Sequence, residues 1–453
     1  MKHVAVTLAL VFALQFTAAG AQERIGAIGP SFGHAIALGS QTLAVGAPEH
    51  DQGRGGFWIY RRLDAGGWTL ELQVDGSLGD SLGYSLDLDG SQLLIGAPGG
   101  GRACIYLRES AGWREQACLQ ASGVRFGAAV ALRNIFAVVG SPEYDQRRGR
   151  VDIYTNVGQD VWTHHSMLPG EQQEDTFGSA LAVNLEMLLV GAPRADEPRG
   201  RDAGLTYAYH RTGGSDWVLQ AVLTAGDAGF DQGFGNAVTI EEAQQTTHAL
   251  IGAARAKRTY LFVHNQDLWE QADFFTPVPG MPSQAPGTSV ALSDDIAIIG
   301  SPSTTPAKPG AAWIMQIDTT RIWQLTHHLE NHPAFGTSVS AHTGQFAVAS
   351  PGEGIYVYSR SHVLARAPAP EVPMFGGYPN PFTDLLTITL DGTAHSVMQV
   401  TIYDAAGRQI AVLDARGRSS LNWSPAYLTP GFYTAIARSS TGMDMRHFVR
   451  IAQ

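Results

Sequence analysis

Two aspartate pairs supply the residue type that a calcium site requires. Asp87 and Asp89 alternate along one segment, and Asp294 is followed directly by Asp295. Ca²⁺ binds about six to eight oxygen atoms, so a calcium loop needs about three or more carboxylates at alternate positions. Each of these segments offers only two. The sequence therefore predicts no metal site and no cofactor, and calcium at these two pairs is the alternative.

A second set of acids lies in loops that differ in length and sequence. Each loop combines acids with arginines or aromatic residues. Variable loops on a rigid scaffold commonly carry binding residues. The predicted binding residues are Glu49, Asp51, Glu143, Asp145, Asp196 and Asp231. The alternative is that these acids only keep the loop tips solvated.

The sequence predicts no catalytic residues. It contains no His-Glu-x-x-His, no Gly-x-Ser-x-Gly and no phosphate-binding loop. Two histidine pairs, His164-His165 and His327-His328, fall in expected strands, where successive side chains point to opposite faces. We therefore expect a binding or adhesion protein and not an enzyme. The alternatives are an extracellular enzyme that degrades glycans or phosphoesters, and a structural component of a surface layer.

The first residues predict export. Residues 1–21 combine a short basic start, an apolar run from Val4 to Phe16 and a small-residue Ala-x-Ala pattern, which is typical of a cleaved signal peptide. The apolar run is shorter than the roughly 20 residues that a membrane-spanning helix needs. No later stretch reaches about 18 consecutive apolar residues. We expect no transmembrane segment in the mature chain.

The chain has two cysteines, Cys104 and Cys118, and export permits a disulfide between them. They lie in two expected strands of one hairpin. A three-residue loop over 110–112 would pair Glu109 with Trp113 and place the cysteines directly opposite each other. We predict a disulfide, and two separate buried thiols are the alternative.

Two short motifs recur seven times between residues 31 and 360. The first is Phe-Gly or a variant, at positions 32–33, 82–83, 126–127, 177–178, 234–235, 286–287 and 335–336. The second is Gly-Ala-Pro or a variant, at positions 46–48, 96–98, 140–142, 191–193, 252–254, 300–302 and 349–351. The two motifs are 13 residues apart in six repeats and 17 apart in the fifth. Such regularity indicates a repeat architecture.

Each repeat contains four expected strands, and the last begins at a tryptophan in six repeats. Seven four-stranded units of about 50 residues predict a seven-bladed β-propeller. The six tryptophans are expected to pack between neighbouring sheets. The seventh repeat has no such last strand before the proline-rich segment, so we predict that the segment from Gln22 to Ile28 closes the ring by pairing with that repeat.

These motifs resemble the FG-GAP repeat family, which is best known from the propellers of integrin α-subunits. The resemblance covers residues 31 to 360 and implies a propeller that binds proteins or glycans. The calcium loops common in that family are reduced here to the two aspartate pairs. The predicted propeller domain spans residues 22–364.

The last part of the chain differs in composition from the repeats. A proline-rich linker is expected at residues 365–373, and short alternating strands over residues 374–453 predict a small Ig-like antiparallel β-sandwich. The segments 378–382, 403–408 and 431–433 resemble the C-terminal sorting domain of the bacterial type IX secretion system. That resemblance implies passage through the periplasm, contact with the secretion machinery through residues 374–453, and a secreted or cell-surface location.

The overall composition fits an all-β protein. Glycine makes up 52 of 453 residues, a proportion well above the usual value of about 7%, and such an excess suits many tight turns. The net charge of −11 is spread without a basic cluster, which excludes nucleic acid as the expected partner. An extracellular protein or polysaccharide is the expected partner.

Overall fold

A computed structural model describes residues 23–360 and 375–450 with gaps. The gaps in the first part are 65, 122–123, 159, 214–215, 244–245, 266–267, 277–284, 304, 306–307 and 318–322. Those in the second are 379–382, 391–396, 405–407, 425–428, 430 and 440–442. The predicted signal peptide (1–21) and linker (365–373) lie outside the described residues.

The described residues between 23 and 360 form seven antiparallel sheets of four strands each. In six of these sheets the strands follow chain order. They are β2 (Ala35–Leu38), β3 (Thr42–Ala47), β4 (Gly56–Arg62) and β5 (Trp68–Asp75); β6 (Ser85–Asp89), β7 (Gln92–Ala97), β8 (Arg102–Glu109) and β9 (Gly112–Gln120); β10 (Ala129–Arg133), β11 (Phe136–Ser141), β12 (Arg150–Asn156) and β13 (Trp162–Pro169); β14 (Ala180–Val183), β15 (Met187–Ala192), β16 (Leu205–Arg211) and β17 (Trp217–Leu223); β18 (Ala237–Ala243), β19 (Thr246–Ala253), β20 (Arg258–Asn265) and β21 (Leu268–Phe275); and β22 (Ser289–Ser293), β23 (Ile296–Ser301), β24 (Gly310–Ile317) and β25 (Trp323–Asn331).

The remaining sheet joins the two ends of this region. It contains β1 (Glu23–Gly26), β28 (Gly354–Ser359), β27 (Gln345–Ser350) and β26 (Val339–His342), in that order. β1 pairs antiparallel with β28, with Ile25 opposite Ile355. The prediction that the N-terminal segment closes the ring is confirmed. The short helices α1 (His50–Gly53) and α2 (Tyr144–Arg147) lie in loops between strands.

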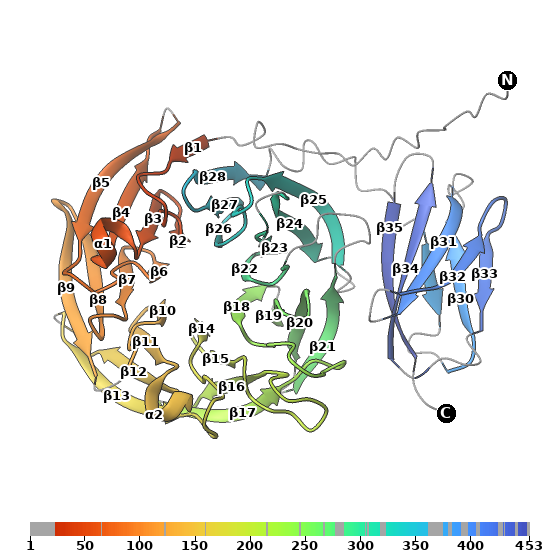
Figure 1. Ribbon diagram of the computed structural model, residues 1–453, viewed down its shortest axis with the longest axis horizontal. Helices are drawn as coiled ribbons and strands as arrows, with labels where there is room; N and C mark the ends of the chain where they lie inside the picture. The colour runs from red at the N-terminus through yellow and green to blue at the C-terminus, as the bar shows by residue number, and fades with distance from the viewer. Residues whose placement is uncertain are drawn as a thin grey trace.

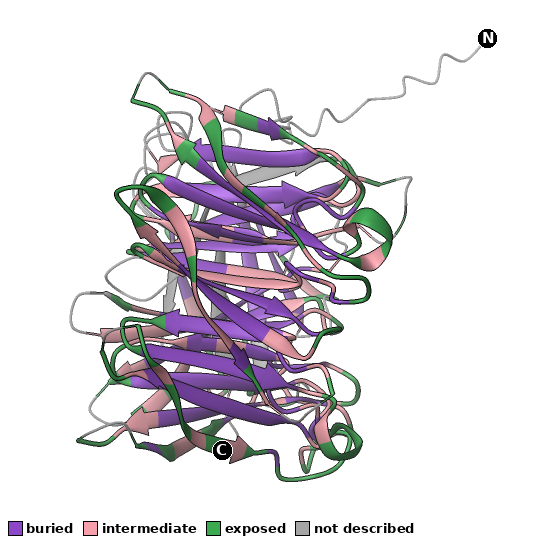
Figure 2. Cartoon of the chain, turned by 90° about the vertical axis from the view of Figure 1, so that its left-hand side faces the viewer, coloured by how far each residue is buried: buried purple, intermediate pink, exposed green. Residues whose placement is uncertain are grey.

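The seven sheets surround a central opening, with the first strand of each repeat innermost (Figure 1). Each innermost strand contacts the innermost strands of both neighbouring sheets, including β26 with β2, so the circle is complete. Seven apolar clusters, one at each junction between neighbouring sheets, form the core of the ring. Figure 2 shows the buried residues following the strands and the exposed ones gathering in loops.

The two recurrent motifs meet where neighbouring sheets are closest. Gly83 has a φ of +84°, a region that favours glycine, and its N–H donates to the carbonyl of Gly96 in its own repeat. A Cβ atom on Gly46 would lie 2.0 Å from the carbonyl oxygen of Gly83 in the next sheet. The first motif's phenylalanines, such as Phe32 and Phe126, are fully buried. The motifs are therefore explained by close packing between sheets.

The tryptophans of the outer strands link one sheet to the one before it. The indole N–H of Trp113 donates to the Glu71 carboxylate (3.1 Å), and that of Trp162 donates to the Gln116 side chain (3.0 Å). Trp269 makes the same kind of bond to the preceding outer strand. The predicted packing role holds for these residues, with a polar contact that the sequence did not indicate.

A disulfide joins Cys104 and Cys118, which lie directly opposite each other on β8 and β9. The hairpin differs from the expected one. Glu109 pairs with Gly112 and not with Trp113, so the loop has one residue fewer than predicted. A bulge shifts the register between Ile105 and Tyr106 and restores the opposition of the two cysteines.

Residues 375–450 form two further antiparallel sheets. One has the order β29 (Phe375–Tyr378), β30 (Leu386–Leu390) and β33 (Ser420–Trp423), and the other β32 (Gln409–Asp414), β31 (Val397–Asp404), β34 (Gly431–Ser439) and β35 (Met443–Arg450). Both contribute to one core cluster, which includes Ile388, Trp423, Val400 and Ala435. Like the ring, this part is all-β. No helix among the described residues is long and apolar enough to span a membrane.

Candidate functional site

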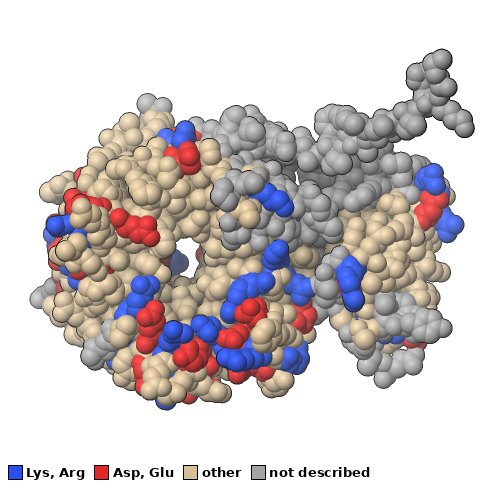
Figure 3. All heavy atoms as spheres, viewed as in Figure 1, with Lys and Arg blue, Asp and Glu red and all other residues tan. Residues whose placement is uncertain are grey.

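One face of the ring carries the loops that the sequence singled out. These are the loops between the second and third strands of a sheet, together with the connections from one sheet to the next; we call this side the loop face. Both short helices project from it (Figure 1). Figure 3, seen from the same side, shows acidic and basic side chains crowded together next to the central opening. The loop face is therefore a polar surface built from ordered loops, and it is the candidate binding surface.

Two of the predicted acids stabilise equivalent turns. Asp51 contacts Arg54 at 3.0 Å in α1, and Asp145 contacts Arg148 at 3.1 Å in α2. In each turn, three consecutive residues (51–53 and 145–147) have positive φ angles. A left-handed conformation costs a non-glycine residue about 1–2 kcal/mol. These ion pairs help to hold strained turns in place.

Three more predicted acids also have partners within the loop face. Glu143 lies 3.6 Å from Arg125, and Asp231 lies 2.6 Å from Arg255. Asp196 accepts a hydrogen bond from a backbone N–H six residues further along its own loop. These carboxylates thus fix loops and guanidinium groups, and the structure brings them together on one face without collecting them in one pocket.

The sixth predicted acid, Glu49, lies exposed on the rim beside His34. Burial lowers the pKa of His34, and the negative charge of Glu49 partly opposes that effect. The His34 ring contacts Tyr84 at 4.9 Å between centroids, and the guanidinium of Arg125 stacks on Tyr84 at 4.7 Å. A row of contacting side chains therefore leads from His34 through Tyr84 to Arg125.

Next to this row the loop face is hollowed by an open depression of about 440 Å³. Its lining includes Tyr84, Arg125, Arg147, Thr176, Ser179 and Arg194. We call this feature the arginine depression. Its volume falls within the range of small-ligand sites, about 300–1,000 Å³. The three arginines come from three different loops of consecutive sheets and meet because those sheets pack side by side.

The guanidinium groups of the arginine depression have few partners. Arg125 and Arg194 lie 3.6 and 3.5 Å from their nearest carboxylates, and the Nε atom of each is buried without a hydrogen-bond partner. Arg147 lies 3.0 Å from Glu174, and both side chains are about half exposed. Each guanidinium carries five N–H donors. The site is therefore rich in donors for an anionic group.

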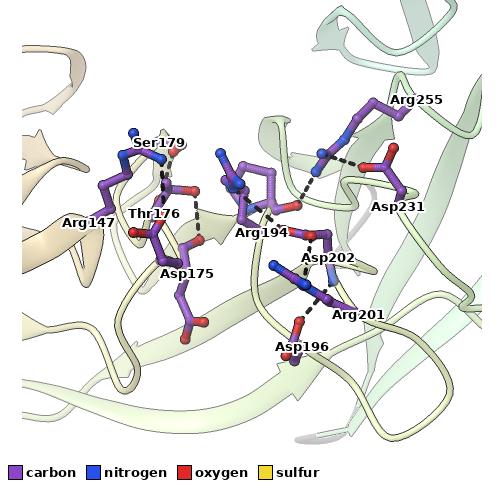
Figure 4. Close-up of polar contacts among 12 residues, drawn as sticks. Arg147, Asp175, Thr176, Ser179, Arg194, Asp196, Arg201, Asp202, Asp231 and Arg255 are labelled. Carbon is purple, nitrogen blue, oxygen red and sulfur yellow. Dashed lines mark hydrogen bonds and ion pairs between the residues drawn. The ribbon is translucent and has the colours of Figure 1, made fainter.

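A network of polar contacts supports this wall of the arginine depression (Figure 4). Arg255 donates to the carbonyl of Pro193 at 2.6 Å and so braces the loop that carries Arg194. The Arg194 backbone N–H donates to the carbonyl of Asp175. Burial raises the pKa of the Asp175 carboxyl to about 6. Hydrogen bonds thus connect the loop that carries Arg194 to the two neighbouring loops that carry Asp175 and Arg255.

The four candidate calcium ligands lie outside the lining of the arginine depression, and Asp87, Asp89 and Asp295 accept hydrogen bonds from the protein. Asp87 accepts backbone N–H groups of Leu132 (2.7 Å) and Leu88 (2.9 Å), and Asp89 accepts one from the residue after Arg133. Burial raises the pKa of Asp87 to about 6. The pair connects two neighbouring innermost strands.

The second candidate pair is similarly occupied. Both oxygens of Asp295 accept hydrogen bonds from the guanidinium of Arg360, at 2.6 and 2.9 Å, and Asp294 lies in the turn with a φ of +55°. Within the described part of the chain, the one cluster compact enough for a metal ion is Cys104, Glu115 and Cys118, and its cysteines are in the disulfide.

The described histidine pair points in two directions, as predicted. His164 contacts the buried Asp152 of its own sheet at 2.9 Å, and His165 lies 3.4 Å from Asp216 of the neighbouring sheet. The side chains of His327 and His328 lie outside the described residues. The pair at 164–165 therefore does not act as a joint chelating or acid–base unit.

The three arginines of the depression were not predicted from the sequence. Arg194 directly follows the second motif of its repeat, Arg125 directly precedes the first motif of its repeat, and Arg147 lies four residues beyond Glu143. Two of the three therefore lie directly beside a repeat motif, and all three line the arginine depression. Comparing them across repeats would have been the available signal.

Comparison with known proteins identifies the C-terminal part. Residues 377–450 match the family described as the secretion system C-terminal sorting domain. No curated protein matches the sequence. Among solved structures, the chain is similar to Sqt1 of Saccharomyces cerevisiae, with 10% identity, a TM-score of 0.44, and coverage of 96% of this chain and 99% of that one.

The sorting domain establishes where the protein goes. A type IX secretion sorting domain at the C-terminus indicates export, followed by attachment at the cell surface or by secretion. It also implies contact with the type IX secretion machinery. The predicted localisation is confirmed.

Proposed function

We propose that this protein is a non-enzymatic binding or adhesion protein, secreted or held at the cell surface, that uses the loop face of a seven-bladed β-propeller of the FG-GAP type. Seven four-stranded sheets, the closed circle of innermost strands and the recurrent glycine contacts support the propeller assignment. The two sheets of residues 375–450 share one core, which supports an Ig-like sandwich for the sorting domain.

The observation that carries the proposal is a loop face that is organised in advance. Ion pairs fix α1 and α2, and hydrogen bonds brace the walls of the arginine depression. Preorganised groups lose less conformational freedom when a partner binds, so more of the contact energy appears as affinity. The partner is an extracellular protein or polysaccharide that contacts the loop face.

The mature chain, residues 22–453, tests this function in a screen against glycan arrays and extracellular proteins. Asp145→Ala and Asp51→Ala form a matched pair, because each removes the same ion pair from equivalent turns. Both should lower stability by a similar amount, and only Asp145→Ala should weaken binding, because its turn carries Arg147. Equal losses of binding would show that the turns act only through stability. Turnover of a polysaccharide or phosphoester panel by the same preparation would contradict the non-enzymatic assignment.

A further inference from the structure

We propose that the arginine depression binds the anionic groups of an acidic polysaccharide, with Arg125, Arg147 and Arg194 as its ligands. This inference rests on the proposed binding function and gives its partner a chemical class. Carboxylates and sulfates suit guanidinium groups because the planar fork donates two parallel hydrogen bonds to them. The three arginines enter from three loops, so together they present several such forks to one ligand.

The ion pairs of Arg125 and Arg194 are looser than hydrogen bonds, whereas Arg147 donates to Glu174 at 3.0 Å and would have to share that donor with a ligand. Arg125 and Arg194 have no carboxylate closer than 3.5 Å, and the Nε atoms of both are buried without a hydrogen-bond partner. A buried donor without a partner costs about 1–3 kcal/mol. An anion that draws the two guanidinium groups toward it would offset that cost.

Arg147 occupies a backbone position that favours glycine. Its φ is +60°, and the equivalent residue of the α1 turn is Gly53, with a φ of +83°. The two loops otherwise match closely, with Asp-Gln before and Arg-Gly after this position. Strained residues that persist in a fold point to a functional role. The side chain of Arg147 lines the arginine depression, whereas glycine would leave that wall without a donor.

The hydroxyl groups of the site suit a ligand that is rich in hydrogen-bond donors, such as a sugar. The Thr176 hydroxyl donates to the carbonyl of Asp175 at 2.6 Å, and the Ser179 hydroxyl donates to the carbonyl of Thr176 at 2.7 Å. Each hydroxyl proton is therefore already donated within the protein, and each hydroxyl oxygen can still accept a hydrogen bond from a ligand. Sugar hydroxyls donate to such acceptors, and the backbone N–H groups of a peptide can do the same, so polyglutamate is included below to separate the two ligand classes. The lining is completed by Ala128, Pro142 and the carboxylate of Glu143, and Tyr84 supplies an aromatic side chain.

Binding of defined polymers to the mature chain tests the assignment. The probes are polygalacturonate, which carries carboxylates, dextran sulfate, uncharged dextran and polyglutamate. The variants are Arg125→Gln, Arg147→Gly and Arg194→Gln. Arg54→Gln is the control, because this arginine lies in the α1 turn on the same face, is 46% exposed and is not part of the lining.

We expect polygalacturonate or dextran sulfate to bind, each depression variant to bind at least tenfold more weakly, and Arg54→Gln to bind within twofold of the unmodified chain. The stronger of the two polymers identifies the anionic group. Unchanged affinity in all three variants would overturn the site and leave the proposed binding function intact. Equal binding of uncharged dextran, or equal and arginine-dependent binding of polyglutamate, would overturn the ligand class. Absence of binding to every probe would overturn the inference, whereas the proposed function fails only if the partner screen is also negative.

Discussion

Replacing Ile25 by alanine tests whether β1 holds the ring closed. The Ile25 side chain is 9% exposed and packs in the cluster shared by the first and last sheets, with Ile355 and Val357 of β28 among its members. Truncation of a buried isoleucine to alanine costs about 2–5 kcal/mol, from lost burial and the cavity left behind. Because β1 is a four-residue outer strand whose surroundings can relax, we expect a loss near the lower end, about 2–3 kcal/mol.

Ile28→Ala is the matched control, because the residue type and the substitution are the same and this side chain is 50% exposed. Surface substitutions usually change stability by no more than about 0.5 kcal/mol. Urea unfolding of the mature chain, followed by tryptophan fluorescence, measures both variants; Trp68 packs against the same cluster and reports on this junction. Equal midpoints for the two variants would refute the conclusion that β1 contributes to closure.

Three further predictions follow from contacts in the ring. Replacing Cys104 and Cys118 together by serine should cost about 3 kcal/mol in urea unfolding, because the disulfide closes a loop with a sequence separation of 14, and reduction of the unmodified chain should match it; no loss in either case would contradict this. Burial raises the pKa of Asp87 to about 6, above its value in the unfolded chain, so the folded state binds more protons between about pH 4 and 6. The contribution of this group to the free energy of unfolding therefore falls as the pH rises through that range, by up to about 3 kcal/mol. Asp87→Asn should flatten that part of the stability–pH curve, and an unchanged slope would count against the assignment. A double-mutant cycle of Trp162→Phe and Gln116→Leu should give a coupling of about 0.5–1.5 kcal/mol, and strictly additive effects would show that their hydrogen bond does not stabilise the junction.

The repeat pattern made much of the ring predictable. The spacing of the two motifs located the strands, because those glycines are required wherever one sheet meets the next, as at Gly46 and Gly83. The missing last strand of the seventh repeat also predicted the pairing of β1 with β28. Both predictions were possible because every copy of the repeat has the same motifs and the same order of strands.

The arginine depression could not be predicted in the same way. Arg125, Arg147 and Arg194 are 22 and 47 residues apart in sequence, and their convergence depends on the angle between sheets. The acids were predicted as binding residues because they are frequent in the loops. Asp145 instead pairs with Arg148 and stabilises the turn that carries Arg147. The shorter cysteine hairpin was missed for a related reason, since a bulge such as that at Ile105 has no clear sequence signature.

The position of β28 has a mechanical consequence. The chain leaves the ring after Ser359 toward the sorting domain, so a pulling force applied through the sorting domain enters the ring at β28. This strand is hydrogen-bonded to β27 on one side and to β1 on the other. Pulling it free requires two ladders to break, and one of them is made by the opposite end of the chain. The ring therefore resists being unravelled from its tethered end.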